Sequence, residues 1–270
     1  MQTVAQALTL ARATGVDRLD AQLILAHVLA QSRSWVIAHD DAPLAASHAD
    51  AVRTAFTRRA EGEPLAYLLG EKEFHGLLLQ VDANVLVPRP DTEVLVDWAL
   101  ELLADVKAAR VVDLGTGSGA IALAVKHGCP AATVLATDIS PHALDVARGN
   151  AHRLVLAVEF EAGSWWEAVA NQRFNLVLSN PPYIAGGDSH LAALQHEPTL
   201  ALTPGGDGLD ALREIVGGAA PHMAPGAWLL LEHGYDQAEA VQALLRESGF
   251  EGIATRHDLA GQPRCTGGQR

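Results

Sequence analysis

Hydrophobic positions in the first part of the chain recur with the spacing of amphipathic helices. After Asp17, the apolar side chains with this spacing are Leu19, Leu23, Ile24, Val28 and Leu29. A later stretch, residues 45–60, places Val52 and Phe56 on one face and arginines on the other. No pattern typical of a strand interrupts this region. We therefore predict a small helical bundle over residues 1–75, as the first of two domains.

Residues 76–90 have a different pattern. Two short apolar runs, LLLQV and NVLV, are separated by Asp82-Ala83-Asn84. Such a polar break between two β-like runs is typical of a hairpin turn. We predict that residues 76–90 form a β-hairpin linker between the two domains.

Apolar runs of strand length alternate with helical stretches from residue 91 to residue 270. The predicted strands are RVVDL, ATVLAT, VLAVEF, FNLVL and AWLLLEH, followed by a final β pair. Because these runs are apolar on both faces, they indicate a mostly parallel sheet covered by helices on both sides. The predicted fold class is α/β and Rossmann-like, preceded by the helical bundle.

Composition and charge exclude several classes of function. The chain has 270 residues and a formal net charge of −13, which argues against a phosphate-tracking nucleic-acid surface. The two cysteines are far apart and the histidines form no metal-ligand pattern, so neither a disulfide framework nor a metal site is expected. We find no leader peptide pattern and no apolar run of membrane-spanning length. These features predict a cytoplasmic protein without a membrane partner.

A glycine-rich segment, VVDLGTGSGAIAL, lies between a predicted strand and a predicted helix. It contains Asp113, Gly115, Gly117 and Gly119. Glycines allow a tight turn and close approach of a ligand, and the helix N-terminus offers unpaired N–H groups. The spacing differs from the dinucleotide-binding fingerprint. An acid inside the turn also suits a cationic methionine group better than a pyrophosphate.

Asp138 ends the strand that follows the glycine-rich segment. A carboxylate in this position can accept hydrogen bonds from both hydroxyls of a ribose. The alternative is that Asp138 only caps the helix that begins at Pro141. Together, the glycine-rich segment and Asp138 resemble the S-adenosylmethionine site of a class I methyltransferase.

The segment SNPPYI, residues 179–184, follows the apolar run FNLVL directly. Asn180 is therefore expected at the carboxyl end of a strand, facing the same cleft as Asp113 and Asp138. A planar NH₂ group is a poor nucleophile because its lone pair is delocalised. The Asn180 side-chain oxygen and the Pro181 carbonyl can hold it, and both contacts strengthen as positive charge grows on nitrogen. Tyr183 can stack on a flat amide or base. Adenine N6, guanine N2 and a glutamine amide all carry a planar NH₂ group, so all three remain candidate substrates.

Segments along nearly the whole chain resemble the peptide chain release factor glutamine methyltransferases, the HemK/PrmC family. They are GEPLAYLLGEKEFHG, VPRPDTEVLVDWAL, DLGTGSGAIAL, SNPPYI, HEPTLAL and GGDGL. The resemblance implies methylation of N5 of the glutamine in the Gly-Gly-Gln motif of bacterial class-one release factors, a protein methylation that acts in translation termination. Alternatives are a nucleic-acid adenine-N6 or guanine-N2 methyltransferase and a ribosomal-protein glutamine methyltransferase. The RPDTE form favours release factors over the latter, and no nucleic-acid substrate is expected.

The resemblance also implies roles for individual residues. The cofactor S-adenosyl-L-methionine would contact Asp113, Gly115, Thr116, Gly117, Ser118, Gly119, Asp138, Trp165 and Asn180. The substrate glutamine would contact Asn180, Pro181, Pro182 and Tyr183, and catalysis would rest on Asn180, Pro181 and Tyr183. The helical bundle would be a docking surface for the release factor.

Several other residues could serve the site or the fold. Arg89 and Glu93 could contact the substrate or stabilise the joint between the domains, and Glu197 could brace the loop of the site, so the roles of these three residues stay open. Trp166 is interpreted as a core residue. Ser164 stands where the family usually has Asp, so contact with the adenine amino group would be weaker or come from another residue. The closing TGGQR contains a Gly-Gly-Gln tripeptide. We interpret it as a coincidence, because the tail is expected to pair with the sheet.

Overall fold

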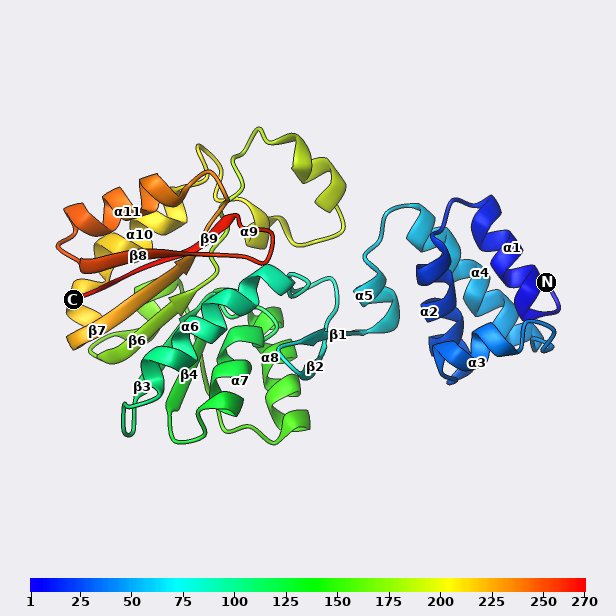
Figure 1. Ribbon diagram of the computed structural model, residues 1–270, viewed down its shortest axis with the longest axis horizontal. Coiled ribbons are helices and arrows are strands. Elements are labelled where there is room, and N and C mark those ends of the chain that lie inside the picture. The colour runs from blue at the N-terminus through cyan, green and yellow to red at the C-terminus, as the bar shows by residue number, and fades with distance from the viewer. The chain divides into compact units, whose positions relative to one another are not determined.

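The computed structural model describes all residues from 1 to 270 (Figure 1). Contacts within the chain divide it into two compact units, Met1–Glu71 and Lys72–Arg270. This division falls slightly before the boundary expected at residue 75.

The first unit is a bundle of helices. They are α1 (Val4–Ala13), α2 (Arg18–Leu29), α3 (Arg33–Ala38), α4 (Ala46–Ala60) and α5 (Leu65–Leu69). Thr3, Asp17 and Ser32 precede the first three helices, and each accepts a hydrogen bond from a backbone N–H of the first turn. Ile24 and Phe56 are almost fully buried between the helices. The apolar periodicity of these segments is therefore the inner face of the bundle.

A hairpin formed by β1 (Glu71–Phe74) and β2 (Leu77–Gln80) follows the bundle along the chain. Its turn lies at His75 and Gly76, which both have positive φ angles. A turn does lie at residues 82–84, where the Val85 N–H donates to the Asp82 carbonyl at 3.2 Å. The prediction that this turn joins a hairpin is wrong, because residues 84–87 form no strand. Val85 and Val87 are apolar because they are buried, at 1% and 5% exposure, without pairing in a sheet.

The second unit is built on a seven-stranded sheet of order β5-β4-β3-β6-β7-β9-β8. The strands are β3 (Arg110–Leu114), β4 (Thr133–Asp138), β5 (Glu159–Ala162), β6 (Phe174–Ser179), β7 (Met223–Glu232), β8 (Glu251–His257) and β9 (Pro263–Gln269). Neighbouring strands from β5 to β7 pair in parallel, and β9 is antiparallel to both of its neighbours. The predicted α/β class is confirmed.

Helices cover both faces of this sheet (Figure 1). The helical elements are η1 (Pro90–Thr92), α6 (Glu93–Leu103), α7 (Ala120–Gly128), α8 (Pro141–Leu154), η2 (Trp165–Val169), η3 (Ser189–Leu194), α9 (Thr199–Leu202), α10 (Asp210–Gly218), η4 (Ala220–His222) and α11 (Ala238–Glu247). Val111 contributes to the core beneath α6 and α7, whereas its neighbour Val112 contributes to the core beneath α10 and α11. This alternation explains why the strands are apolar throughout. No helix of the protein combines the length and hydrophobicity needed to cross a membrane.

The C-terminal tripeptide Gly267-Gly268-Gln269 lies in β9, between β7 and β8. The expectation that the tail pairs with the sheet is therefore confirmed. Gly267 pairs with Leu230. A Cβ atom on Gly267 would stand 2.4 Å from Leu230 Cδ2 and 2.8 Å from the Leu229 carbonyl oxygen. The glycine at position 267 therefore has a packing reason within the protein's own fold.

Replacing Gly267 with alanine is expected to lower the free energy of unfolding by about 1–3 kcal/mol, because the added methyl group overpacks the sheet. Denaturant unfolding measures this change. Gly187→Ala is the matched control, since a Cβ there would meet no heavy atom within 4 Å. Equal stability of the two variants would contradict the packing reason for Gly267.

Candidate functional site

A cavity of about 390 Å³ lies at the carboxyl ends of the parallel strands, within the second unit. The predicted site residues in its wall are Gly115, Thr116, Gly117, Ser118, Asp138, Trp165, Asn180 and Pro182. The predicted residues outside its wall are Asp113, Gly119, Pro181 and Tyr183. Strand ends far apart in the sequence thus meet around one cavity, as the polar residues at those ends predicted.

The glycine loop leaves β3 and folds back onto β4. The backbone N–H groups of Gly115 and Thr116 both donate to the Thr137 carbonyl, at 2.9 and 2.8 Å. A Cβ atom on Gly115 would stand 3.2 Å from the ring of Trp165. Gly115 therefore lets the indole approach the backbone closely. Trp165 itself has a φ angle of +41°, which is rare for a bulky residue and marks functional sites in many proteins.

Asp138 ties the end of β4 to the glycine loop. One carboxylate oxygen accepts from the Gly117 N–H, and the other accepts from the Ser140 N–H, both at 2.9 Å. The helix cap is Ser140, whose hydroxyl oxygen accepts from the Ala143 N–H. Asp138 therefore holds the glycine loop as well as the start of α8, and its contact with the ribose stays a prediction. A carboxylate has about four lone-pair sites, so Asp138 can accept further hydrogen bonds from the cavity. Burial raises the pKa of Asp138 above its usual value.

Asp113 is fully buried beneath the glycine loop. One carboxylate oxygen accepts from the Thr116 hydroxyl at 2.6 Å and the Ala122 N–H at 3.2 Å, whereas the other has no partner. Burial raises the pKa of Asp113 to about 7. These contacts join the loop to α7, and a contact between Asp113 and the cofactor stays a prediction.

Gly119 also serves the packing beneath the loop. A Cβ atom on Gly119 would stand 3.0 Å from Leu123 Cδ1 and 3.2 Å from Ala147 Cβ. The glycine therefore permits close packing of α7 against α8. A contact between Gly119 and the cofactor stays a prediction.

The segment 180–183 leaves β6 at the edge of the cavity. The Asn180 side-chain NH₂ donates to the Thr92 hydroxyl oxygen at 3.2 Å. Pro182 lies in the cavity wall, whereas Pro181 is buried and lies outside it. The Tyr183 hydroxyl donates to Glu232 at 3.3 Å, and the Tyr183 carbonyl accepts from the Gln237 side chain at 3.0 Å. The segment is thus held rigidly, and stacking of Tyr183 on the substrate stays a prediction.

Glu232 is a residue of this region that sequence reasoning missed. It ends β7, and its carboxylate is buried. One of its oxygens accepts from the Tyr183 hydroxyl, and the other has no partner. Burial raises the pKa of Glu232 to about 7. The signal was the polar residue that ends the apolar run AWLLLE, the same signal that identified Asp138 and Asn180.

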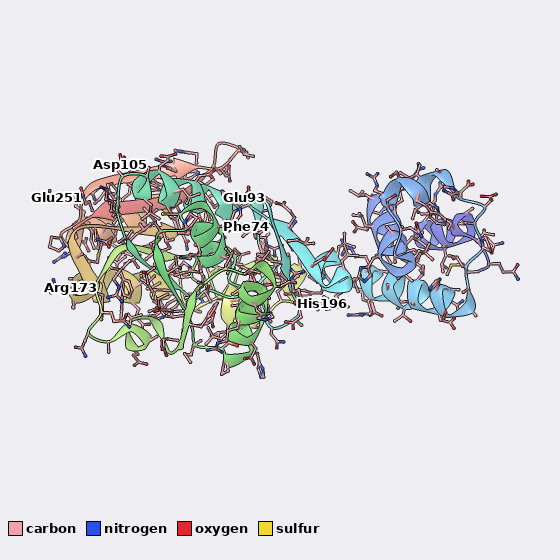
Figure 2. All side chains as sticks on the ribbon, turned by 90° about the horizontal axis from the view of Figure 1, so that it is seen from below. Phe74, Glu93, Asp105, Arg173, His196 and Glu251 are labelled. Carbon is pink, nitrogen blue, oxygen red and sulfur yellow. The ribbon has the colours of Figure 1, made fainter.

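Arg89, Glu93 and Glu197 brace the segments around the cavity. Arg89 pairs with the buried carboxylate of Glu197, which also accepts from the Val87 N–H at 3.1 Å. Glu93 accepts from the His75 N–H at 3.0 Å, in the hairpin turn. Figure 2 shows Glu93 close to Phe74, a residue of the cavity wall. Of the two roles left open by the sequence, these contacts favour the structural one.

Two tryptophans of η2 have different surroundings. Trp165 lies in the cavity wall together with Ser164. Trp166 donates its ring N–H to the Ile215 carbonyl at 3.0 Å and stacks on His222. Trp166 therefore packs against the helical layer, as expected for a core residue.

The charges of the cavity wall are mostly negative. Its acidic residues are Asp138, Asp210 and Glu214, and its basic residue is Arg89, which is paired with Glu197. Exposed Ile139 and the Trp165 ring provide apolar surfaces beside the glycine loop. Three features fit S-adenosylmethionine. The glycine loop allows close approach of the ligand, the Asp138 carboxylate can accept from the ribose, and the surface of Ile139 and Trp165 can hold the adenine. The acidic wall suits the cationic sulfur. The acidic wall disfavours a polyanionic ligand.

Comparisons with known proteins agree with this geometry. Two family models match the chain, the Methyltransferase small domain over residues 92–208 and the PrmC N-terminal domain over residues 2–70. The release factor glutamine methyltransferase of Bordetella pertussis is 52% identical over 94% of this chain and 95% of its own length. That of Xylella fastidiosa strain Temecula1 is 47% identical over 97% of each chain.

Solved structures share the fold. The ribosomal protein L11 methylase from Lactobacillus delbrueckii subsp. bulgaricus superimposes with a TM-score of 0.51 at 21% identity. This match covers 71% of the present chain and 85% of the methylase. At this identity, the similarity concerns the fold alone.

Proposed function

The chain belongs to the family of release factor glutamine methyltransferases, and we propose that it methylates N5 of a release-factor glutamine, the one in the Gly-Gly-Gln motif. The methyl donor is S-adenosyl-L-methionine. The observation that carries this proposal is identity of 52% over nearly the full length of a relative with that name. The position of Asn180 in the wall of a cavity beside the glycine loop supports it.

We assign the cofactor to the glycine loop and the residues facing it. When bound, S-adenosylmethionine supplies a methyl group activated by a positively charged sulfur. The backbone of Gly115 and Gly117 allows close approach, and Asp138 accepts from the ribose hydroxyls. The Trp165 ring provides a flat apolar surface for the adenine. The mostly acidic wall favours the cationic sulfur over an anion.

We assign the substrate amide to Asn180 and Pro181. The Asn180 side-chain oxygen and the Pro181 carbonyl accept from the NH₂ group of the glutamine and align its nitrogen for attack. These acceptors stabilise the positive charge that develops on nitrogen more than they stabilise the neutral amide, which lowers the barrier. Pro182, which lies in the cavity wall, would limit the movement of the glutamine side chain. Tyr183 would act by stacking or by holding the segment through Glu232.

A protein substrate is favoured over a nucleic acid. The net charge is −13, and the single basic residue of the cavity wall is paired with Glu197. A nucleic acid requires lysines and arginines that neutralise its phosphates. We therefore expect no direct nucleic-acid substrate, and we expect the protein to act in the cytoplasm with the translation machinery. Docking of the release factor by the helical unit also stays a prediction.

Methyl transfer from labelled S-adenosylmethionine tests this function. Purified protein is incubated with a bacterial class-one release factor, and in parallel with DNA and with ribosomal RNA. Label is expected on the release factor alone. A release factor whose Gly-Gly-Gln glutamine is replaced by alanine is the control and should remain unlabelled. Label on nucleic acid, or equal labelling of the two release factors, would contradict the proposal.

A further inference from the structure

Residues 199–208 contact two parts of the site. On one side they contribute to the cavity wall, through Leu200, Ala201, Thr203 and Pro204. On the other side they pair with the chain just after Tyr183, where the Ile184 N–H donates to the Leu202 carbonyl at 3.0 Å. This bond joins the cavity wall to the end of the segment that we assign to the substrate amide.

The peptide group between Tyr183 and Ile184 is bound at both of its polar atoms. Its N–H donates to Leu202, and its carbonyl accepts from the side-chain NH₂ group of Gln237 at 3.0 Å. The oxygen of the same Gln237 amide accepts from the Gly234 N–H at 2.9 Å. Because one end of this amide meets a carbonyl and the other meets an N–H, the amide satisfies both partners in one orientation only.

Gly208 leaves the space for this contact. Its φ angle is +82°, and a Cβ atom there would stand 2.4 Å from the Tyr183 carbonyl oxygen and 3.0 Å from Nε2 of Gln237. A backbone carbonyl cannot move aside as the end of a flexible side chain can, so a larger residue would overpack this point. The glycine is therefore required by the hydrogen bond as well as by the left-handed backbone.

The Pro181 carbonyl lies between two fixed points of the chain. Before it, Ser179 ends β6 and pairs with Leu114 of β3. After it, the peptide group of Tyr183 is held at both ends. The rings of Pro181 and Pro182 keep two of the φ angles in between nearly fixed. The Pro181 carbonyl itself accepts no backbone N–H, so its direction depends on these two fixed points.

We propose that Gln237 is a positioning residue that aims the Pro181 carbonyl at the substrate amide by holding the Tyr183 carbonyl. This inference rests on the proposed function. Gln237 lies outside the cavity wall, so it acts through the segment and does not touch the reacting atoms. Without this contact the peptide group after Tyr183 can rotate, and the Pro181 acceptor loses its alignment with the attacking nitrogen.

Gln237→Met tests the contact in the full-length protein. Methionine keeps the length of the side chain but cannot donate to the Tyr183 carbonyl. We expect methyl transfer to a release factor to slow by about 10-fold, the scale of one lost positioning hydrogen bond. The Kd of S-adenosylmethionine should stay unchanged, because the glycine loop is intact. Single-turnover labelling gives the rate per cofactor-binding site, so a loss of folded protein does not affect the result.

The matched control for Gln237→Met is Gln172→Met. The Gln172 side chain accepts from the Arg110 guanidinium at 2.7 Å, beside the starts of β3 and β6 and at the end of the sheet away from the cavity. This variant also loses a side-chain hydrogen bond of a glutamine, and it should keep the wild-type rate.

Gly208→Ala breaks the same contact from the opposite side and does not depend on Gln237→Met folding. Gly205→Ala is its control, since Gly205 has a φ angle of +83° in the same loop but a Cβ there would meet no heavy atom within 4 Å. Both variants carry similar backbone strain, and only Gly208→Ala collides with the Tyr183 carbonyl. Gly208→Ala should therefore transfer the methyl group more slowly than Gly205→Ala.

The double variant Gln237→Met/Gly208→Ala should be no slower than the slower of its two single variants, because both changes remove one contact. A wild-type rate for Gln237→Met, equal rates for the two glycine variants, or multiplied losses in the double variant would overturn the proposal. Failure of the wild type to label any release factor would instead refute the proposed function.

Discussion

Replacing Asn180 with alanine is expected to lower kcat for methylation of the release factor by about 10²–10³-fold, the usual cost of one preorganised polar contact to a transition state. The variant loses the acceptor that stabilises charge on the substrate nitrogen. The Kd of S-adenosylmethionine should change much less, because the glycine loop and Asp138 remain. Single-turnover labelling gives the rate of transfer, and calorimetry gives the Kd.

A second asparagine on the same strand supplies the control for this experiment. Asn175 lies near the start of β6, at the opposite end from Asn180, and its side-chain oxygen accepts from the Arg110 N–H at 2.9 Å. Asn175→Ala should keep the wild-type rate. A near-normal rate for Asn180→Ala would show that other groups hold the substrate amide, and the proposed mechanism would be wrong.

Replacing Asp138 with alanine is expected to raise the Kd of S-adenosylmethionine by about 10–100-fold, because hydrogen bonds to a charged group contribute about 1.5–3 kcal/mol. The carboxylate holds the Gly117 N–H and the Ser140 N–H, at 2.9 Å each, and faces the cavity. Its removal therefore loosens the loop and also deletes the proposed acceptor for ribose. Calorimetric titration with the cofactor measures this change.

The control for Asp138 is an acidic residue of the following helix. Asp145 lies on α8 and pairs with Arg148 at 3.7 Å, with 74% of its side chain exposed. Such surface pairs contribute little, so Asp145→Ala should bind the cofactor as the wild type does. If Asp138→Ala bound the cofactor with wild-type affinity, the cofactor would have to lie away from the end of β4.

Most strands in the sheet of the second unit were predicted correctly from the sequence. The strands β3, β4, β6 and β7 lie where continuous apolar runs predicted them, since burial on both faces requires such runs. The run VLAVEF was only partly right. Strand β5 begins at Glu159, because Val155 adopts a left-handed conformation at the end of α8. Leu156 and Val158 of this run pack against the core beside the sheet, whereas Val155 is exposed. A pattern of hydrophobicity cannot separate such packing from strand pairing.

The polar ends of the strands identified part of the site for a simple reason. Parallel strands bring their carboxyl ends to one edge, so Asp138 and Asn180 had to lie near each other. The same rule applies to Glu232, but the sequence analysis did not identify this residue, because charged residues also follow apolar runs wherever a buried strand returns to the solvent. The pattern could not indicate that Tyr183 would turn its hydroxyl to Glu232, since that contact joins two segments 49 positions apart in the sequence.

The sequence by itself determined the fold class, the glycine loop and the strand-end residues, because these follow from local spacing and from the period of burial. Only the tertiary structure decided which polar groups pair. Thr92 reaches Asn180 across 88 positions of sequence, and Arg89 reaches Glu197 across 108. A hydrogen bond depends on distance and direction to within a few tenths of an ångström, and residue order does not fix such geometry until the whole chain has packed.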